Sequence, residues 1–324
     1  MEVVEEAVEE VMEDARTIEL FGKNIPVRKY GCRNYQMKEP LYITVPRVNL
    51  FIQTTNFCNA NCPFCIYHGK DTRKFNLEKL EMVLKEIRSK EDLDLGKLNF
   101  TGGEPTLNHS VRFDELCDVC ESNIRNDERR PEVTLNTNGF NLEAIIKHQD
   151  FLDSVGLSRH HYLDEFNMNI FDSALIPSAS DLKDFMRELR RKDIIQLRCN
   201  LIKGQIDDYG DMVKYLEHSI DIGILDCGFV TLAPNNQYCK DHQVDFNSLV
   251  QLNKEIIRTN YWNRVEDNDF NKVYCECANY VYSNSKGQMC KFYARLFCNN
   301  DNSDGMLVYD GQNLRHGFGG EIII

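Results

Sequence analysis

The sequence predicts an α/β fold built on a parallel sheet. From Asn49 onward, short apolar strand patterns alternate with amphipathic helix patterns, which is typical of parallel strands joined by right-handed crossovers. A chain of 324 residues, of which 42% are hydrophobic, is long enough to bury a full core. We expect one large domain and a smaller one.

The expected elements begin with an acidic amphipathic helix over residues 1–18 and a strand-rich lead-in over residues 19–48. Strands are expected at residues 49–55, 97–101, 132–137, 166–171, 194–202 and 226–232. Helices are expected near residues 77–91, 110–122, 141–149, 179–192 and 207–220. Asn76 and Ser180 are suitable capping residues for two of these helices.

The strand expected at residues 194–202 has two different faces. Period-2 alternation places apolar side chains on one face, whereas the other holds Gln196, Arg198 and Asn200. A strand packed on both sides would be almost continuously hydrophobic. The polar face therefore predicts a wet or ligand-filled interior, and a strand with one solvated face is the alternative.

Three cysteines, Cys58, Cys62 and Cys65, follow the first of these strands with the spacing C-x3-C-x2-C. An ordinary thiolate-bound iron-sulfur cluster uses four cysteines, so a compact loop of three leaves one iron for another ligand. Half of a structural zinc site, or three unrelated buried cysteines, are the alternatives.

Downstream, residues 98–105 (LNFTGGEP) indicate a strand that runs into a glycine turn ending in Glu104. Together with the cysteine loop, this turn resembles the radical S-adenosylmethionine (SAM) superfamily. The resemblance implies a [4Fe-4S] cluster on Cys58, Cys62 and Cys65, whose fourth iron is chelated by the amine and carboxylate of SAM. It also implies that Gly102, Gly103 and Glu104 receive the methionine amine.

The same resemblance implies an open, partial (β/α)6 TIM-like barrel, with both motifs at the carboxyl ends of the strands. Thr137 and Asn138 match the turn after the third strand, and Asn169 is the candidate in the fourth, where the family binds the ribose and carboxylate of SAM. The family's more usual Ser-x-Asp is absent there. Phe64 matches an aromatic that contacts adenine. Asn200 begins a segment similar to the fifth strand of the GTP cyclase of molybdenum-cofactor synthesis and of its peptide-modifying relatives.

A second cysteine group comprises Cys275, Cys277, Cys290 and Cys298. The intervening residues indicate a hairpin with a turn near Gly287, so the cysteines at both ends are expected to converge on a metal. The arrangement resembles the twitch hairpin, a shortened SPASM domain that holds one auxiliary [4Fe-4S] cluster, although the spacing to the last hairpin cysteine departs from it. Zinc is the alternative. With four ligands the cluster would be closed, and with three it would leave an iron open.

We expect three regions: a lead-in at residues 1–48, the barrel at 49–235 and the twitch-like domain at 236–324. Of the remaining cysteines, Cys227 and Cys239 flank the last barrel strand and are weak candidates for donating a hydrogen atom. The net charge of -13 argues against nucleic acid as a partner. Without a membrane span or signal peptide, the protein is expected in the cytoplasm.

The resemblance implies reductive cleavage of SAM to a 5'-deoxyadenosyl radical, which abstracts a hydrogen atom from substrate, with flavodoxin or ferredoxin as the electron donor. The expected substrate is a ribosomally made peptide that is oxidised, cross-linked or epimerised. A dehydrogenase or epimerase of a sugar or aminocyclitol is the alternative. A GTP cyclase ranks lower, because the terminal Gly-Gly of that family is missing. A non-catalytic iron-sulfur or zinc protein is the alternative from another class.

Overall fold

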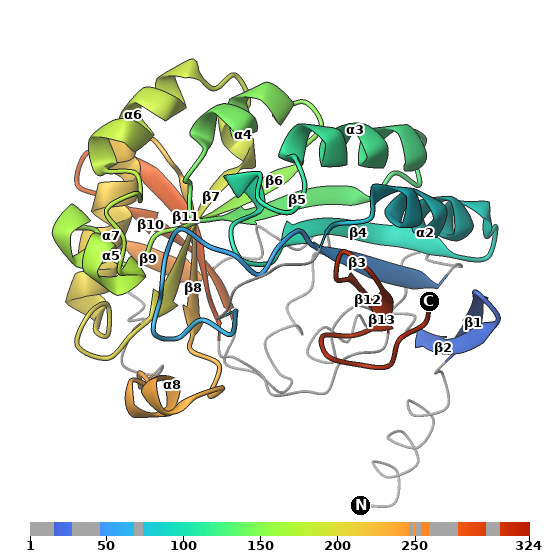
Figure 1. Ribbon diagram of the computed structural model, residues 1–324. Helices are drawn as coiled ribbons and strands as arrows, with labels where there is room; N and C mark the ends of the chain where they lie inside the picture. Colours follow the sequence, from blue (N-terminus) through green and yellow to red (C-terminus); the bar gives the residue numbers. More distant parts are fainter. Residues whose placement is uncertain are drawn as a thin grey trace, which may run out of the picture.

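The computed structural model describes residues 16–27, 46–67, 74–245, 249, 254–258, 278–295 and 305–324. A twisted sheet forms its centre, and helices lie along one face of this sheet (Figure 1). An antiparallel ribbon of β1 (Arg16–Leu20) and β2 (Lys23–Val27) stands apart from the main sheet. Residues 16–18, expected as the end of a helix, form the start of β1 instead. The rest of the helix expected at residues 1–18 lies outside the described residues.

Six consecutive strands pair in parallel and confirm the predicted α/β class. They are β3 (Arg47–Gln53), β4 (Asp94–Thr101), β5 (Glu132–Thr137), β6 (Ser154–Ser158), β7 (Ile195–Leu201) and β8 (Asp226–Thr231). The α-helices that follow them are α2 (Leu77–Ser89), α3 (Phe113–Asn123), α4 (Leu142–His148), α5 (Asp164–Phe171), α6 (Ala179–Glu188), α7 (Tyr209–Ile222) and α8 (Gln237–Asp241). Two short 3-10 helices are η1 (Pro105–Leu107) and η2 (Lys192–Ile194).

The C-terminal part of the chain extends this sheet at both edges. On one side β11 (Met289–Arg295) lies parallel to β8 and is followed by β10 (Ala278–Ser283) and β9 (Ile256–Arg258). On the other, β12 (Met306–Tyr309) lies parallel to β3 and pairs with β13 (Leu314–His316). Within the described residues, the sheet has eleven strands and stays open, with β13 and β9 at its edges.

The core lies between the sheet and its helices. On β3, Val48, Leu50 and Ile52 are fully buried on the helix side, and they join one large apolar cluster with the buried face of α2. Burying each such side chain contributes about 1.5–3 kcal/mol. Asn76 caps α2 as expected by accepting a hydrogen bond from the backbone of Lys79. This packing fixes the carboxyl ends of the strands, where the loops emerge.

The strand expected at residues 166–171 is wrong, because this segment forms α5. The fourth strand is β6, which has only five residues with Gly156 in the middle, so its sequence lacked a strand pattern. The side chain of Asn167, which is 1% exposed, accepts hydrogen bonds from the backbone nitrogens of His160 and His161. These tertiary contacts stabilise a helix where the alternating sequence suggested a strand. Likewise, Ser178 rather than Ser180 caps α6.

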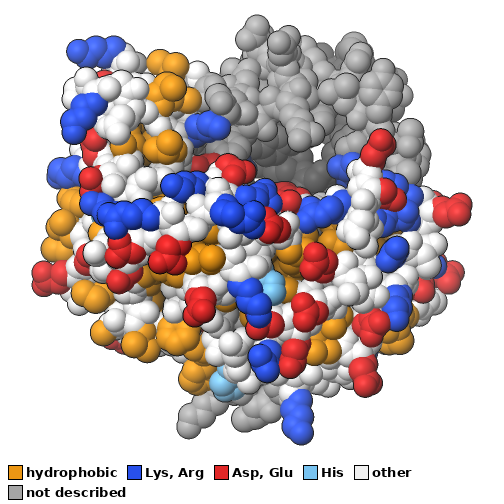
Figure 2. Space-filling model, turned by 90° about the horizontal axis from the view of Figure 1, so that it is seen from above, with side chains coloured by type: hydrophobic (Ala, Val, Ile, Leu, Met, Phe, Trp, Pro, Cys, Tyr) orange, Lys and Arg blue, Asp and Glu red, His pale blue; other side chains and the backbone are white. Residues whose placement is uncertain are grey.

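The face of the molecule seen in Figure 2 carries acidic and basic side chains interspersed with one another. Several charged side chains on the helices that cover the sheet form ion pairs, such as Lys147 with Asp114 at 2.7 Å. None of the helices in the described ranges is both long and apolar enough to cross a membrane.

Candidate active site

The loop with the three cysteines leaves the carboxyl end of β3 without regular secondary structure. Backbone N–H groups point at two of its sulfurs, since Ala60 N lies 3.4 Å from Cys58 Sγ and Tyr67 N lies 3.3 Å from Cys65 Sγ. A further backbone bond joins Cys65 N to Cys62 O at 3.0 Å. The loop therefore already directs donors toward atoms that would carry negative charge as thiolates.

Burial raises the pKa of all three thiols. It raises the pKa of Cys58 to about 11, and the neighbouring thiols Cys65 and Cys58 add to the upward shift of the Cys62 pKa. Without a cation the thiols are therefore protonated near neutral pH. A metal centre that takes them as thiolates displaces these protons, so binding couples to proton release.

The sulfurs of Cys58, Cys62 and Cys65 do not all lie within 4.8 Å of one another. Within the described residues, the one group of three potential ligands lying within 4.8 Å of one another consists of aspartates and includes no cysteine. A tetrahedral zinc site, with Zn–S bonds of about 2.3 Å, would hold its sulfurs closer than that. At least one pair of the thiols therefore lies farther apart than one zinc ion would hold it, and three thiols in one loop also suit three different irons of one cluster.

The glycine turn after β4 is hydrogen-bonded to the segment that leads into the cysteine loop. Gly103 N donates to Thr55 O at 2.6 Å, and Glu104 N donates to Phe57 O at 2.9 Å. A Cβ on Gly103 would lie 2.5 Å from the carbonyl carbon of Phe57, and Gly102 has a φ of 124°. The two motifs therefore touch through backbone, and only glycine permits this approach.

The carboxylate of Glu104 is 1% exposed and accepts four hydrogen bonds. Oε1 accepts from Thr106 N at 3.0 Å, Thr106 Oγ1 at 2.7 Å and Thr137 Oγ1 at 2.6 Å, while Oε2 accepts from Asn138 N at 2.8 Å. Burial raises the pKa of Glu104, and the four donors oppose this shift. The side chain thus holds the turn after β5 against the glycine turn. Thr137, expected to contact SAM, has its hydroxyl in this network.

Asn138 also contacts the cysteine loop. Its Nδ2 lies 3.6 Å from Cys58 Sγ and 2.8 Å from the Oδ1 of Asn59, and its Oδ1 accepts from Phe140 N at 3.0 Å. These bonds set the orientation of the amide. The Nδ2 of Asn59 is buried and has no partner in the structure. A thiolate-bound cluster offers sulfur acceptors, so the residues around the loop fit the group that the sequence implies.

An aromatic contact ties the loop to β6 and β7. Phe64 meets the ring of His160 edge-on at 5.0 Å, and His160 stacks on Phe171 at 4.8 Å. Asn200 N donates to His160 Nδ1 at 3.0 Å. Burial lowers the pKa of His160 to about 3, so the ring is neutral and carries its proton on Nε2. Sequence analysis missed His160, because it follows the strand that was not recognised.

The remaining expected SAM contacts are more scattered. Asn169 lies in the last turn of α5, where its backbone oxygen accepts from Asp172 N, and its binding of SAM stays a prediction. Asp172 Oδ2 in turn accepts from Asn61 Nδ2 at 3.1 Å, which links α5 to the cysteine loop. Asn200 lies near the carboxyl end of β7, two positions beyond Arg198.

Cys290 does not lie where a ligand shared with the other C-terminal cysteines was expected. It is fully buried on β11 opposite Tyr282, beside the closed end of the β10–β11 hairpin, and its Sγ lies 3.7 Å from that of Cys227. At the open end Ala278 pairs with Ala294, roughly 13 Å away along the strand. Cys290 thus lies at the closed end of the hairpin beside Cys227, and its role as a metal ligand stays a prediction. The other three, Cys275, Cys277 and Cys298, lie outside the described residues.

The two candidate hydrogen-atom donors lie in different surroundings. Cys227 is fully buried and its Sγ lies 3.1 Å from the hydroxyl of Ser219 on α7, so it belongs to the helix side of the sheet. Cys239 on α8 is 1% exposed, and its Sγ lies 3.7 Å from the carbonyl oxygen of Phe64 in the cysteine loop. Only Cys239 adjoins the candidate site.

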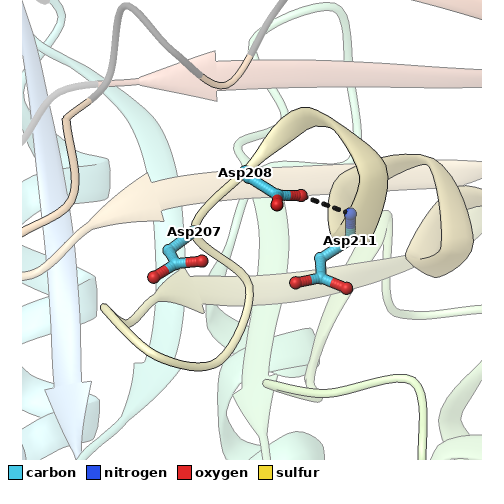
Figure 3. Close-up of side chains that lie close together, drawn as sticks. All are labelled: Asp207, Asp208 and Asp211. Atoms are coloured by element: carbon cyan, nitrogen blue, oxygen red, sulfur yellow. Dashed lines mark hydrogen bonds between the residues drawn. The ribbon is translucent and has the colours of Figure 1, made fainter.

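Three aspartates gather where α7 begins (Figure 3). Asp207 accepts from Gly204 N at 2.6 Å, Asp208 caps the helix by accepting from Asp211 N at 2.8 Å, and Asp211 accepts from Lys214 at 2.9 Å. Each carboxylate therefore already has a structural partner in the turn or the helix.

The sequence of this chain matches a protein-family model and several curated proteins. The model of the radical SAM superfamily matches residues 52–216. A probable GTP 3',8-cyclase of Methanocaldococcus jannaschii is 26% identical over 181 residues, or 55% of this chain and 56% of the relative. The S-adenosylmethionine-dependent nucleotide dehydratase RSAD2 of Danio rerio is 27% identical over 165 residues, or 50% and 44%.

Among solved structures, Streptococcus suis SuiB bound to S-adenosylmethionine is 17% identical, with a TM-score of 0.46 over 60% of this chain and 44% of that one. The chain spans about half the length of the curated relatives it matches. The family model covers just over half of the chain, including the cysteine loop, the glycine turn, all of β4 and the last two residues of β3. The chain therefore belongs to the radical SAM superfamily.

Proposed function

We propose that this protein uses SAM and a [4Fe-4S] cluster on Cys58, Cys62 and Cys65 to remove a hydrogen atom from a polar substrate. The observation that carries the proposal is the contact between the three-thiol loop and the glycine turn at the carboxyl edge of a parallel sheet. When bound, the cluster supplies the electron that cleaves SAM to the 5'-deoxyadenosyl radical. A reduced flavodoxin or ferredoxin is the proposed source of that electron.

The protein's own residues hold and orient these groups. The loop presents three thiols, with N–H donors around them, and Glu104 fixes the turn that bears Asn138. Within the described residues, no donor bonds the carbonyl oxygens of Gly102 and Gly103, which makes them candidates for receiving the methionine amine. The Glu104 carboxylate itself is saturated by internal donors, so we assign it a positioning role.

For the substrate, the sequence favours a ribosomally made peptide, which would be oxidised, cross-linked or epimerised. A nucleotide is the second candidate, because curated relatives include a probable GTP 3',8-cyclase and a nucleotide dehydratase. A sugar or aminocyclitol remains the alternative from the sequence. An auxiliary cluster on the C-terminal cysteines, which would accept an electron from the substrate radical, also stays a prediction.

The test is iron and sulfide content with SAM turnover on anaerobically reconstituted protein. The loop variant Cys58→Ala/Cys62→Ala/Cys65→Ala should lose about four irons and all formation of 5'-deoxyadenosine. Cys199→Ala, which removes a buried thiol outside the loop, is the control and should keep both. Wild-type protein that binds iron but yields no 5'-deoxyadenosine with an active reductant would refute the proposal.

A variant that leaves the cysteine loop intact tests the auxiliary cluster separately. Cys275→Ala/Cys277→Ala/Cys298→Ala should lower the iron content by about a further four if these residues ligate a second cluster. An unchanged iron content would remove the auxiliary cluster. The buried position of Cys290 predicts that Cys290→Ala alone leaves the iron content unchanged.

A further inference from the structure

The sheet face opposite the helices carries a connected row of polar side chains, which we call the polar face. Asn136 Nδ2 donates to Asn99 Oδ1 at 3.0 Å, and the guanidinium of Arg198 donates from Nη1 to Asn136 Oδ1 and from Nε to Gln196 Oε1. Gln196 Nε2 then donates to Asp226 Oδ1 at 2.7 Å. The row crosses β4, β5, β7 and β8, and Arg198 is at its centre.

Two glycines leave space for this row. A Cβ on Gly156 of β6 would lie 2.5 Å from the Cζ of Arg198, and a Cβ on Gly228 of β8 would lie 2.7 Å from the Cε1 of Tyr293. Tyr293 of β11 donates its hydroxyl hydrogen to Gln196 Oε1 at 3.3 Å. The missing side chains on β6 and β8 thus let the guanidinium and the phenol lie close to the sheet backbone.

Arg198 forms no salt bridge in the described part of the chain. No carboxylate there lies within 4.0 Å of its guanidinium, although the side chain is partly buried. Its Nε and Nη1 donate to neutral amide oxygens of Gln196 and Asn136. Its Nη2 forms no hydrogen bond with any of the described residues. The carboxyl in the row, Asp226, is bonded to Gln196; burial raises its pKa to about 7, and the charge of Arg198 opposes this shift only weakly compared with burial. A partly buried charge without a partner is costly, and an anion would offset that cost.

The position of Arg198 relative to the cysteine loop suits a substrate contact. Asn200, two residues further along β7, bonds His160, and His160 contacts Phe64 of the loop. Two strand residues span about 7 Å. A molecule whose anionic group sat on Arg198 would extend along the polar face toward the loop that is proposed to hold the cluster.

We propose that Arg198 binds an oxyanion group of the substrate, a phosphate or a carboxylate, on the polar face. The inference rests on the proposed function only in that it takes the bound anion to be part of the substrate. The anion site itself is a property of the polar face. It narrows the substrates to those that carry a negatively charged group.

The test measures binding of two probes to full-length, anaerobically reconstituted protein with SAM, by equilibrium dialysis at low and moderate salt. GTP is the phosphate probe, and the blocked peptide acetyl-Glu-Ala-Glu-amide is the carboxylate probe. At least one probe should bind wild type saturably, and Arg198→Gln should weaken it about tenfold or more, which is the size of a lost charged hydrogen bond. Arg190→Gln, in an exposed ion pair with Asp150, is the control and should bind normally.

Gly156→Ala is the second variant, because it pushes on the guanidinium without changing any charge, and it should weaken the same probe. Iron content and thermal unfolding check that each variant keeps its fold. GTP binding alone assigns a phosphate-bearing substrate, and peptide binding alone assigns a carboxylate-bearing one. Failure of both probes with wild type, or equal binding by Arg198→Gln, overturns the anion site. Absence of 5'-deoxyadenosine from wild type overturns the proposed function instead.

Discussion

Replacing Glu104 by glutamine tests whether this carboxylate positions the site or binds SAM itself. A glutamine can keep its Oε1 facing the three donors of Thr106 and Thr137. Its NH2 group then replaces Oε2 and meets Asn138 N–H, donor against donor. Glu104→Gln therefore breaks one buried hydrogen bond to a charged acceptor and weakens three others.

Losing a buried hydrogen bond to a charged group costs about 1.5–3 kcal/mol. Adding the weaker bonds to the threonines, we expect Glu104→Gln to lower the free energy of unfolding by about 2–4 kcal/mol. That is a large fraction of the roughly 5–15 kcal/mol that stabilises a typical domain. Because Asn138 would also shift away from Cys58, the variant should take up less iron on reconstitution.

Urea denaturation of the cluster-free protein, followed by circular dichroism, measures the stability difference without interference from iron. Glu115→Gln on α3 is the matched control, since its carboxylate lies on the surface 3.8 Å from Arg112, and it should change stability by less than about 0.5 kcal/mol. A Glu104→Gln protein as stable as wild type, with only a raised Kd for SAM, would refute the positioning role. It would support direct binding of the methionine amine.

Three other changes have definite expected outcomes. Gly103→Ala forces a Cβ against the backbone before the cysteine loop, so reconstituted iron should fall well below that of the control Gly210→Ala; equal iron would contradict the close approach. The native pKa of Asp226, about 7, lies above the unfolded value of about 3.9, so wild-type stability should fall as pH rises from about 4 to 7. Asp226→Asn should then raise the unfolding free energy by about 2 kcal/mol at pH 8 but not at pH 4, and pH-independent urea midpoints would rule this out. Asn138→Ala removes a donor to Cys58 Sγ, so the cluster's midpoint potential, followed by electron paramagnetic resonance, should become more negative; an unchanged potential would show that this contact is lost in the loaded protein.

The parallel sheet could be predicted because most of its strands are long apolar patterns separated by amphipathic helices. Leu197, Cys199 and Leu201 pointed to a buried face on β7, and the structure buries all three. The fourth strand could not be predicted, since β6 offers only five residues around Gly156. Its glycine makes room for Arg198 from another strand, and a local pattern carries no information on such a contact.

For the candidate active site, too, local patterns could be recognised in the sequence, whereas contacts between distant segments could not. The cysteine loop and the glycine turn were recognisable because their chemistry depends on residues close in sequence. Contacts between distant segments decide the direction of the Glu104 carboxylate and the neutral state of His160. They also decide that Arg198 forms no salt bridge within the described residues. The hairpin around Gly287 was predicted correctly, but the contact of the Cys290 thiol with Cys227 of β8 depends on the pairing of two distant strands, which a local pattern does not show.

The pairing of β12 with β3 has a consequence for biosynthesis. Met306 to Tyr309 lie beside Asn49 to Ile52, and Tyr309 Oη donates to Asn76 O at 2.6 Å. A ribosome adding about 5–20 residues per second needs roughly 13–50 s to synthesise the chain between β3 and β12. Until then, the strand that leads into the cysteine loop has an uncovered edge. Iron delivered during translation would thus meet a loop anchored on one side only, and stable assembly of the metal centre should wait for the last segment of the chain.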